Sequence, residues 1–402
     1  MSRSPGSRSA GPRFDVVVVG AGPAGAAAAL AARRAGARVL LLDRADFPRD
    51  KPCGDGIAAD ALDVLAHLGV PDAAHGYPPV ARLRLVAPGG AVVARPLPRP
   101  ARTVPRRIFD ARLVTAAVAA GAELRRHTVR TVHDDGYEVR VACATDSSLR
   151  GSDEYRAAVV IGADGAGSVV RRALGHPPNP PGHLALALRG YSPWEGAWSA
   201  YPAGGGEQLI VTTSARWPAY AWAFPLGDGS ANVGYGEVLR GAPVSRAYLL
   251  ERLAGLLPGA EPAGLRAHHL PLSTRRPPPA CGRVLLAGDA LSLINPFTGE
   301  GIFYAVLSGA LAGAAAAGAP HEAAARYTAA LRRRLGRHLR HSGVAARLTQ
   351  RPQVVDAAVR AAHRHGAVFD RMVDLGLADG VFDLRTIGRI AAELLHPGPV
   401  RP

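Results

Sequence analysis

Three glycines near the start of the chain have the spacing of a turn that holds a phosphate. The pattern Gly20-x-Gly22-x-x-Gly25 follows a run of valines and opens an alanine-rich stretch. The first glycine allows a tight bend, the second lets the backbone approach a pyrophosphate, and the third lets a helix pack on the preceding strand. The helix N-terminus, where Ala24 stands, then directs free N–H groups and a positive dipole end at the phosphates. This pattern predicts a dinucleotide site.

An acidic residue follows at the distance expected of a ribose-binding carboxylate. A second apolar run, 38–42, ends at Asp43, which lies 23 residues after Gly20 and is followed by Arg44. In dinucleotide-binding units an acid about 20 residues beyond the glycines binds the ribose. We therefore expect a strand–helix–strand unit over 14–45, with Asp43 and Arg44 at the cofactor.

Two later segments repeat the same design, an apolar run that ends in glycine. One carries Asp164-Gly165 and the other carries Gly288-Asp289. Either segment alone fits an ordinary strand end. Because both follow a dinucleotide motif in this order, they favour one cofactor site built from three strand ends.

Together the three segments resemble the flavoprotein hydroxylase superfamily, whose fold is that of para-hydroxybenzoate hydroxylase. The resemblance implies that the cofactor is FAD. It implies that Asp164 and Gly165 lie beside the pyrophosphate and the nicotinamide donor, and that Gly288 and Asp289 bind the ribityl chain.

An arginine before a helical stretch extends this resemblance. The segment Arg106-x-x-Phe109-Asp110 matches a family segment whose arginine lies along the FAD. The simpler alternative is a solvated charge that precedes a helix.

The segment from Asn295 to Ile302 matches the turn under the pyrimidine end of the flavin. We expect a helix that starts near Gly299 and Gly301 and points free N–H groups at flavin N1 and O2, where the reduced ring carries negative charge. Glycine at both positions allows close approach of the backbone. Ile302 is then expected at the cofactor and Pro296 in the substrate pocket.

A cysteine loop narrows the resemblance to one family. The sequence Lys51-Pro-Cys53-Gly54-Asp-Gly is similar to the loop of the geranylgeranyl reductase family that carries a cysteine beside the isoalloxazine. The resemblance implies that Cys53 and Gly54 lie at the flavin. We expect Cys53 to shape the flavin-adjacent pocket, and less strongly to act as the proton donor.

An aromatic strand supports the same family. The sequence Tyr220-Ala-Trp222-Ala-Phe224-Pro is similar to its Tyr-x-Trp-x-Phe-Pro motif. Alternation along a strand places the three rings on one face, and such a wall suits an isoprenoid chain, which offers only apolar surface and π-bonds. The alternative is an ordinary core. We expect Tyr220 and Trp222 in the catalytic pocket, with Trp222 facing Cys53 across the flavin.

The net charge of the chain is unusual. Lysine and arginine number 48 against 32 acidic residues, which gives +16, and Lys51 is the only lysine. The arginine excess fits either attraction to anionic headgroups or a diphosphate, or the composition of a GC-rich genome. No basic stretch is interleaved with aromatic residues, so we expect no nucleic-acid partner.

Cysteine usage and the N-terminus favour a reducing compartment. The three cysteines, Cys53, Cys143 and Cys281, lack both a disulfide pattern and metal-ligand spacing. No apolar segment of signal-peptide type follows the polar N-terminus. We expect a cytoplasmic protein without a metal. Any membrane contact should be peripheral, at the anionic inner surface, through the amphipathic stretches 323–345 and 353–375.

These motifs require particular elements to position them. The predicted fold class is α/β (α+β), with a Rossmann-like FAD domain, a mixed-sheet substrate domain and a C-terminal helical region. The FAD domain is assigned to 14–76, 101–176 and 281–320, the substrate domain to 77–100 and 177–280, the helical region to 321–402, and a disordered arm to 1–13. Helices are expected at 58–68, 110–121 with Asp110 as N-cap, and 301–318, a hairpin at 77–105, a three-stranded meander at 122–160, and further strands at 184–189, 207–213, 219–225, 231–237 and 283–287.

The resemblance implies an FAD-dependent oxidoreductase that saturates C=C bonds of an isoprenoid chain, carried by a diphosphate, a lipid, a quinone or a terpenoid. The expected electron donor is NADPH, with a ferredoxin or a quinol as alternatives. The oligomeric state is left open.

Other functions fit the sequence less well. The alternative enzyme is an FAD-dependent monooxygenase acting on a hydrophobic substrate. A flavin halogenase uses a catalytic lysine away from the FAD loop, and Lys51 lies within that loop. A membrane-surface binding module without activity would rest on the arginine excess alone.

Overall fold

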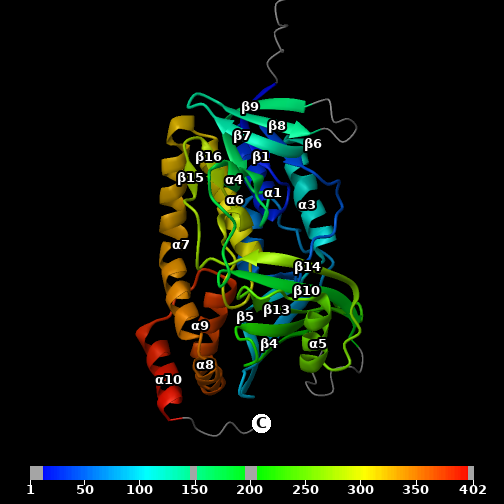
Figure 1. Ribbon diagram of the computed structural model, residues 1–402, viewed down its shortest axis with the longest axis vertical. Coiled ribbons are helices and arrows are strands. Elements are labelled where there is room, and N and C mark those ends of the chain that lie inside the picture. Colours follow the sequence, from blue (N-terminus) through cyan, green and yellow to red (C-terminus); the bar gives the residue numbers. More distant parts are fainter. Residues whose placement is uncertain (1–11, 145–151, 195–205, 397–402) are drawn as a thin grey trace, which may run out of the picture.

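The computed structural model describes residues 12–144, 152–194 and 206–396. Within these residues the chain forms two eight-stranded sheets and ten α-helices (Figure 1). Residues 1–11 of the expected N-terminal arm lie outside the described residues. The mixed α/β architecture with a C-terminal helical region agrees with the predicted fold class.

The first sheet is built around the predicted strand–helix–strand unit. Strands β16, β9, β1, β2 and β6 run parallel in that order, and β15 pairs antiparallel with β16 at one edge. Strands β7 and β8 extend antiparallel from β9. The bounds are β1 Arg13–Val19, β2 Val39–Asp43, β6 Glu123–Arg126, β7 Thr128–Asp134, β8 Val139–Ala144, β9 Ser152–Gly162, β15 Ala280–Cys281 and β16 Val284–Leu286.

Helix α1 (Pro23–Arg34) packs on this sheet against α6 (Ile302–Ala316), far away in the sequence. The two backbones touch, because a Cβ atom at Gly309 would lie 2.0 Å from the Ala24 carbonyl oxygen and one at Gly313 would lie 2.1 Å from that of Ala28. Alanine on α1 and glycine on α6 thus bring the first and third cofactor segments together.

The second sheet lies beside the first along the long axis of the molecule (Figure 1). Its strand order is β14-β10-β13-β12-β11-β4-β5-β3, antiparallel except for the β11–β4 pair. The bounds are β3 Gly56–Ile57, β4 Pro79–Val86, β5 Val92–Thr103, β10 Leu184–Pro193, β11 Glu207–Thr212, β12 Ala219–Pro225, β13 Ser230–Val238 and β14 Ala263–Pro271. We propose that the division into FAD and substrate domains follows the two sheets.

Helices cover both sheets. Helix α5 (Arg246–Leu256) packs on the second sheet, where Leu249 and Leu253 join Ala221 and Val233 in one apolar cluster. Helices α8 (Pro352–Arg364) and α9 (Gly366–Leu377) cover β4 and β5, with Val359 and Phe369 buried there. The others are α2 Ala59–His67, α3 Arg106–Ala119, α4 Val169–Ala173, α7 Ala323–Leu348 and α10 Leu384–Leu395, with the 3-10 turns η1 Gly288–Leu291 and η2 Pro320–Glu322.

Two element predictions are corrected. Helix α3 begins at Arg106 with Pro105 as its N-cap, so Asp110 lies inside the helix and pairs with Arg106. The stretch 353–375 is two helices, because the chain turns at His365 between α8 and α9. None of the helices in the described ranges is long and apolar enough to cross a bilayer.

Candidate functional site

A cavity of about 990 Å³ lies between the two sheets and the C-terminal helices. At one end it is lined by glycine-rich segments and charged side chains, and over most of its length by apolar ones. Of the residues expected to bind the cofactor, it brings together Gly22, Ala24, Cys53, Gly54, Arg106, Gly165, Asp289, Gly299, Gly301 and Ile302. Segments from five distant parts of the sequence therefore meet in one space.

The first glycine motif presents an uncapped helix end to this cavity. Gly22 is the N-cap of α1, and no side chain caps that helix. Gly20 has φ of +95°, and a Cβ atom there would lie 2.4 Å from the Ala163 carbonyl oxygen. The Ala21 N–H donates to Asp43 Oδ2 at 2.7 Å, so the end of β2 fixes the glycine turn. The arrangement suits a phosphate.

The third glycine segment carries a charged pair. Asp289 lies in η1 directly after β16, and the Lys51 ammonium donates to its Oδ2 at 3.3 Å. Burial disfavours the charge of Asp289, but Lys51, together with smaller contributions from His268 and Arg106, holds the pKa of the carboxyl below its ordinary value. The only lysine of the chain thus faces the expected ribityl site.

A neutral histidine stands beside this pair. His268 on β14 has its Nε2 4.0 Å from Asp289 Oδ2, and among the described residues this nitrogen has no hydrogen-bond partner. Burial and the charge of Lys51 lower the pKa of His268. Its free nitrogen is therefore available to a polar group of a ligand.

The cysteine loop is fixed by its backbone. The Asn232 amide donates to the Cys53 carbonyl oxygen at 2.8 Å. Burial raises the pKa of the Cys53 thiol, although the nearby Arg106 cation opposes this shift, so the thiol keeps its proton at neutral pH. Arg106 is itself buried and donates to both oxygens of Asp110, at 2.6 and 2.8 Å.

A buried carboxyl anchors the same loop. Asp55 is fully buried and has φ of +62°, a left-handed conformation that aspartate tolerates better than most residues. Its Oδ2 accepts hydrogen bonds from the Tyr191 hydroxyl at 2.6 Å and from the Asn232 amide at 2.8 Å. Burial raises the pKa of Asp55 to about 6.

The aromatic strand β12 lines the cavity with Tyr220, Trp222 and Phe224. Ala221 and Ala223 lie on the opposite face of the strand and are buried in the apolar cluster under α5. The neighbouring strand places Gly236, Gly234 and Asn232 opposite the three rings. A Cβ atom at Gly234 would lie 2.2 Å from the Trp222 ring, so glycine makes the room for this indole.

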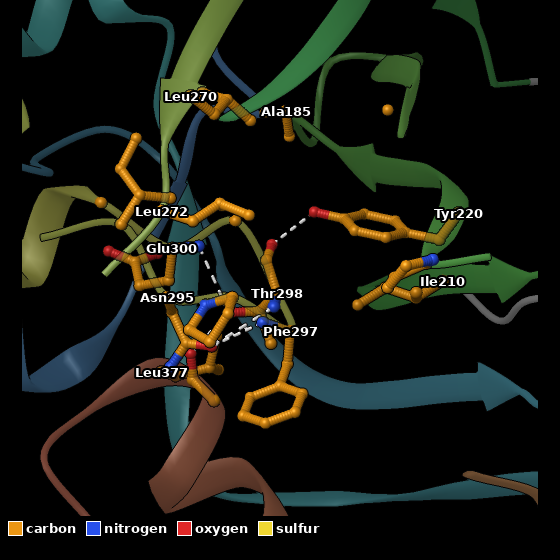
Figure 2. Close-up of a pocket in the computed structure, with 18 of the residues that line it drawn as sticks. Ala185, Ile210, Tyr220, Leu270, Leu272, Asn295, Phe297, Thr298, Glu300 and Leu377 are labelled. Atoms are coloured by element: carbon orange, nitrogen blue, oxygen red, sulfur yellow. Dashed lines mark hydrogen bonds between the residues drawn. The ribbon is translucent and has the colours of Figure 1, made fainter. Parts of the chain in front are cut away.

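The loop 295–301 is tied to the sheet on one side and to α9 on the other. The Tyr220 hydroxyl donates to the Thr298 carbonyl oxygen at 2.5 Å, and Figure 2 shows it reaching across the cavity to that loop. The Asn295 amide donates to the Leu375 carbonyl oxygen at 2.8 Å, and the Thr298 hydroxyl donates to that of Gly376 at 2.6 Å.

A carboxylate occupies the start of α6. Glu300 Oε1 accepts from the Phe303 N–H at 2.7 Å, so one of the N–H groups expected to face the flavin already has a partner. Burial raises the pKa of Glu300 to about 7. Because Glu300 lines the cavity, its charge at neutral pH depends on what occupies that space.

Several expected site residues lie away from the cavity lining. Asp164 caps α4, accepting from Ser168 Oγ at 2.5 Å and from the Val169 N–H at 2.6 Å. Arg44 is exposed to solvent. Gly20, Gly25 and Gly288 act in packing, since a Cβ atom at Gly25 would lie 1.7 Å from the Gly20 carbonyl oxygen and one at Gly288 3.0 Å from Ala24 Cβ.

The expected placement of Trp222 opposite Cys53 needs correction. The Trp222 Nε1–H donates to Asn232 Oδ1 at 2.9 Å, and Asn232 holds the Cys53 carbonyl oxygen. A Cβ atom at Gly54 would lie 3.3 Å from Trp222 Nε1. The indole therefore packs against the cysteine loop, and the two residues form one wall.

The fit of these residues to FAD rests on three features of the cavity. It offers an uncapped helix end at Gly22, a charged pair with an unpartnered histidine nitrogen beside it, and space against the glycines of 295–301. Asp55, Asn232 and Glu300 are not among the site residues predicted from the sequence, and no lining role was predicted for the C-terminal helices. Asp55 and Glu300 stand inside motifs that were recognised; nothing local marks Asn232.

Comparison with known families and proteins gives a consistent result. A sequence family described as "FAD binding domain" matches residues 13–186. The chain is 36% identical over 329 residues to a menaquinone reductase of Mycolicibacterium smegmatis, covering 75% of each. It is 36% identical over 324 residues to a digeranylgeranylglycerophospholipid reductase of Methanopyrus kandleri, covering 77% of this chain and 82% of the relative.

Solved structures share the fold. A geranylgeranyl bacteriochlorophyll reductase-like protein from Thermoplasma acidophilum superposes with a TM-score of 0.79 at 22% identity, covering 96% of this chain and 97% of that one. An anhydrotetracycline hydroxylase from Streptomyces rimosus superposes with a TM-score of 0.68 at 25% identity, covering 91% and 76%. Reductases and hydroxylases therefore use this architecture, and the site must distinguish them.

Proposed function

This chain belongs to the geranylgeranyl reductase family of FAD-dependent flavoproteins, which have the para-hydroxybenzoate hydroxylase fold. From this membership we propose how the protein saturates the C=C bonds of an isoprenoid chain. It is an FAD-dependent oxidoreductase. The relatives named above are reductases of a prenylated quinone and a prenylated glycerophospholipid.

One observation carries the proposal: the cavity joins a charged, glycine-rich end to a long apolar part. The charged end holds Lys51, Arg106 and Asp289. The apolar part is lined from the second sheet and from the C-terminal helices by Leu83, Leu85, Ile210, Leu270, Phe369, Met372, Val373, Leu375, Ile390 and Leu394. A prenyl chain offers no hydrogen-bonding groups, so an apolar channel that ends at a cofactor site suits it.

Reduction of an isolated alkene needs a hydride at one carbon and a proton at the other. FAD, when bound and reduced by the electron donor, would supply the hydride. We assign its binding to those expected cofactor residues that line the cavity, with the N-terminus of α1 at the phosphates and Asp289 at the ribityl chain. Cys53 and Tyr220 keep their protons at neutral pH because burial raises the pKa of both groups. Each can therefore hold a proton at the cavity wall, where Trp222, Phe224 and Pro296 confine the chain.

The Asp289 assignment is tested by FAD affinity. Asp289→Ala removes a charged hydrogen-bond acceptor, and FAD binding should weaken by about 1.5–3 kcal/mol. The measurement is titration of the apoprotein with FAD. Retention of FAD at the wild-type level would contradict the placement of the third glycine segment.

We propose NADPH as the electron donor. Anaerobic mixing with NADPH should bleach the flavin absorbance at a rate compatible with turnover. If only a reduced ferredoxin or a quinol bleaches it, the NADPH assignment is wrong and the donor is that species.

The reaction itself is tested anaerobically. The protein is incubated with dithionite and a panel of geranylgeranyl diphosphate, geranylgeranylated lipid, prenylated quinone and terpenoid, and products are analysed by mass spectrometry. A gain of two hydrogen atoms per reaction supports saturation. The structural similarity to a hydroxylase favours monooxygenation as the second candidate, and product that gains one oxygen atom under air, with none saturated without air, would replace the proposal.

We further propose a cytoplasmic protein that touches the anionic inner face of a membrane, where prenyl lipids reside. The support is the net charge of +16 and the apolar nature of the substrate class. Such contact weakens as salt screens it, since the Debye length falls to about 3 Å at 1 M.

A further inference from the structure

Helix α10 exposes most of its large apolar side chains. Its two buried side chains are polar: Thr386, and Glu393, which pairs with Arg364 on α8 at 3.0 Å. Ile390 is half-buried against the apolar cluster under α8 and α9, whereas the other four are exposed: Leu384 by 87%, Leu395 by 73%, Ile387 by 49% and Leu394 by 43%. A globular protein normally buries such a face, so this helix presents it to something other than water.

The end of α7 adds to the same surface. Val344 is 55% exposed and Leu348 59% exposed. Val344, Leu348, Ile387 and Leu394 also line the cavity. Side chains that are both exposed and part of the cavity lining mark its mouth. Figure 1 places α10 at the outer lower end of the molecule, beyond α8 and α9.

Arginines lie beside the apolar side chains at the end of α7. They are Arg340, Arg347 and Arg351, all exposed, and each is three or four residues along the chain from Val344 or Leu348. No ion pair joins any of these three to a carboxylate of the described residues. Positive charge is therefore available beside an apolar surface, the arrangement that binds an anionic lipid surface.

We propose that α10 and the end of α7 dock on an anionic lipid bilayer, so that the cavity mouth opens directly into the acyl region. This surface rests on, and refines, the proposed membrane contact: it replaces the broad stretches 323–345 and 353–375 by the exposed apolar residues of the mouth. A prenyl chain then passes from bilayer to cavity without crossing water.

A second copy of the chain fits this surface less well. A two-fold contact would bring the same patch of each copy together. The arginines beside each mouth would then face one another, and like charges in contact repel. An anionic bilayer complements both the apolar mouth and the arginines beside it.

The test uses the FAD-loaded, full-length protein and two kinds of vesicle, phosphatidylcholine alone and phosphatidylcholine mixed with phosphatidylglycerol. Leu384→Ser with Leu395→Ser removes the two most exposed leucines of α10, neither of which lines the cavity. Arg347→Gln with Arg351→Gln removes positive charge beside Val344 and Leu348, and neither arginine lines the cavity. The matched control is Leu124→Ser with Tyr137→Ser, which removes an exposed apolar side chain on β6 and an exposed ring in the turn between β7 and β8.

The wild type and the control should float with anionic vesicles and much less with neutral ones. The leucine variant should bind about tenfold or more weakly, because its apolar contact with the acyl region is lost, and the arginine variant should lose its preference for anionic lipid. Saturation of a vesicle-embedded prenyl lipid should fall with binding in the leucine variant, while saturation of a short, water-dispersed prenyl alcohol should stay at the wild-type rate.

The inference is overturned if the leucine variant floats like the wild type, if the wild type binds neither vesicle, or if the leucine substitutions only convert a dimer to a monomer. Vesicle binding that depends on α10 in a protein that saturates no prenyl substrate would support the docking surface and refute the proposed reaction. The two failures are therefore distinguishable.

Discussion

At the scale of single residues, Cys53 combines a fixed backbone with a thiol that stays protonated at the cavity wall. Cys53→Ala removes the sulfur and little volume. We expect unchanged FAD content and flavin reduction, with a clear fall in alkene saturation or a change in how many bonds are saturated. Product analysis by mass spectrometry measures both.

Cys281→Ala is the matched control for this experiment, because Cys281 is exposed and lies outside the cavity. If Cys53→Ala saturates the true substrate at the wild-type rate and extent, the cysteine loop is only a structural turn. The assignment of Cys53 to the catalytic pocket would then be withdrawn.

Asp55 is expected to make the folded protein less stable as the pH rises, because its pKa is raised in the folded state. Its pKa is raised to about 6 in the folded protein, against about 3.9 in an unfolded chain. The folded state therefore binds the proton more tightly, and the stabilising contribution of Asp55 declines as pH rises from about 4 to about 6. Above that range the contribution is constant.

Asp55→Asn tests both the sign and the anchor. The asparagine amide would place a donor among donors from Tyr191 and Asn232, so we expect a loss of about 1–3 kcal/mol in the free energy of unfolding at pH 7. Urea unfolding across pH 4–7 should show the advantage of the wild type over the variant shrinking with rising pH. An advantage that grows with pH would contradict the raised pKa.

Some residue-scale predictions depend on local sequence alone. The glycine spacing and the cysteine loop marked Gly22, Ala24 and Cys53, which line the cavity, and their roles at the cofactor stay predictions. The role of Asp55 depends on Tyr191 and Asn232, which are 136 and 177 residues away. No local pattern encodes partners that lie so far away in the sequence. For the same reason, neither the burial of Asp55 nor its raised pKa could be predicted from its neighbours.

At the scale of elements, the wall of the cavity depends on strand pairing between β12 and β13. Gly234→Ala would place a Cβ atom 2.2 Å from the Trp222 ring. The indole or the strand must move, which should cost about 1–3 kcal/mol in stability and should reduce prenyl saturation. Flavin reduction by the donor should be retained, since the FAD segments lie on other elements.

Gly236→Ala is the control for this strand. Its Cβ atom would lie 3.3 Å from Ala187 Cβ, a contact that a small shift relieves. Thermal unfolding and product analysis of both variants give the comparison. Equal losses in the two variants would mean that glycine matters for the strand backbone and not for the indole.

Period-two alternation was enough to place the three rings of β12 on one face, because that spacing is a property of the extended chain. The start of α3 was misplaced because Asp110 has the residue type of an N-cap. In the structure its carboxylate instead pairs with Arg106 one turn earlier and with Arg49, 3.2 Å away. A tertiary ion pair thus explains a residue that local preference assigned to a cap.

At the scale of the whole molecule, the loop 295–301 connects the expected flavin site to the C-terminal helices. The Asn295 amide donates to the Leu375 carbonyl oxygen and, at 3.1 Å, to the Tyr304 hydroxyl. Asn295→Ala leaves a buried carbonyl oxygen unpaired, and we expect a loss of about 1–3 kcal/mol in stability together with faster hydrogen exchange in α9.

Thr298→Val serves as the comparison, because it removes only side-chain hydrogen bonds of the same loop, among them the one to Gly376. FAD release should be faster in Asn295→Ala than in Thr298→Val. If α9 exchanges at the wild-type rate in Asn295→Ala, the loop and the helices are not coupled. This link could not be predicted from the sequence, because the C-terminal region contains no recognised motif. Its apolar residues indicate that they are buried, but not which surface they cover.

The contact between α1 and α6 has a consequence for how the protein is made. Strand β1 pairs with β9, β9 pairs with β16, and the glycines of α6 seat against α1, so the first domain to leave the ribosome cannot close until residue 316 has emerged. At a synthesis rate of about 5–20 residues per second, roughly 15–60 s pass between the synthesis of the alanine-rich α1 and that of α6, against which it packs. During synthesis the nascent chain therefore exposes an unpaired parallel strand and an apolar helix, which are the features that chaperones bind.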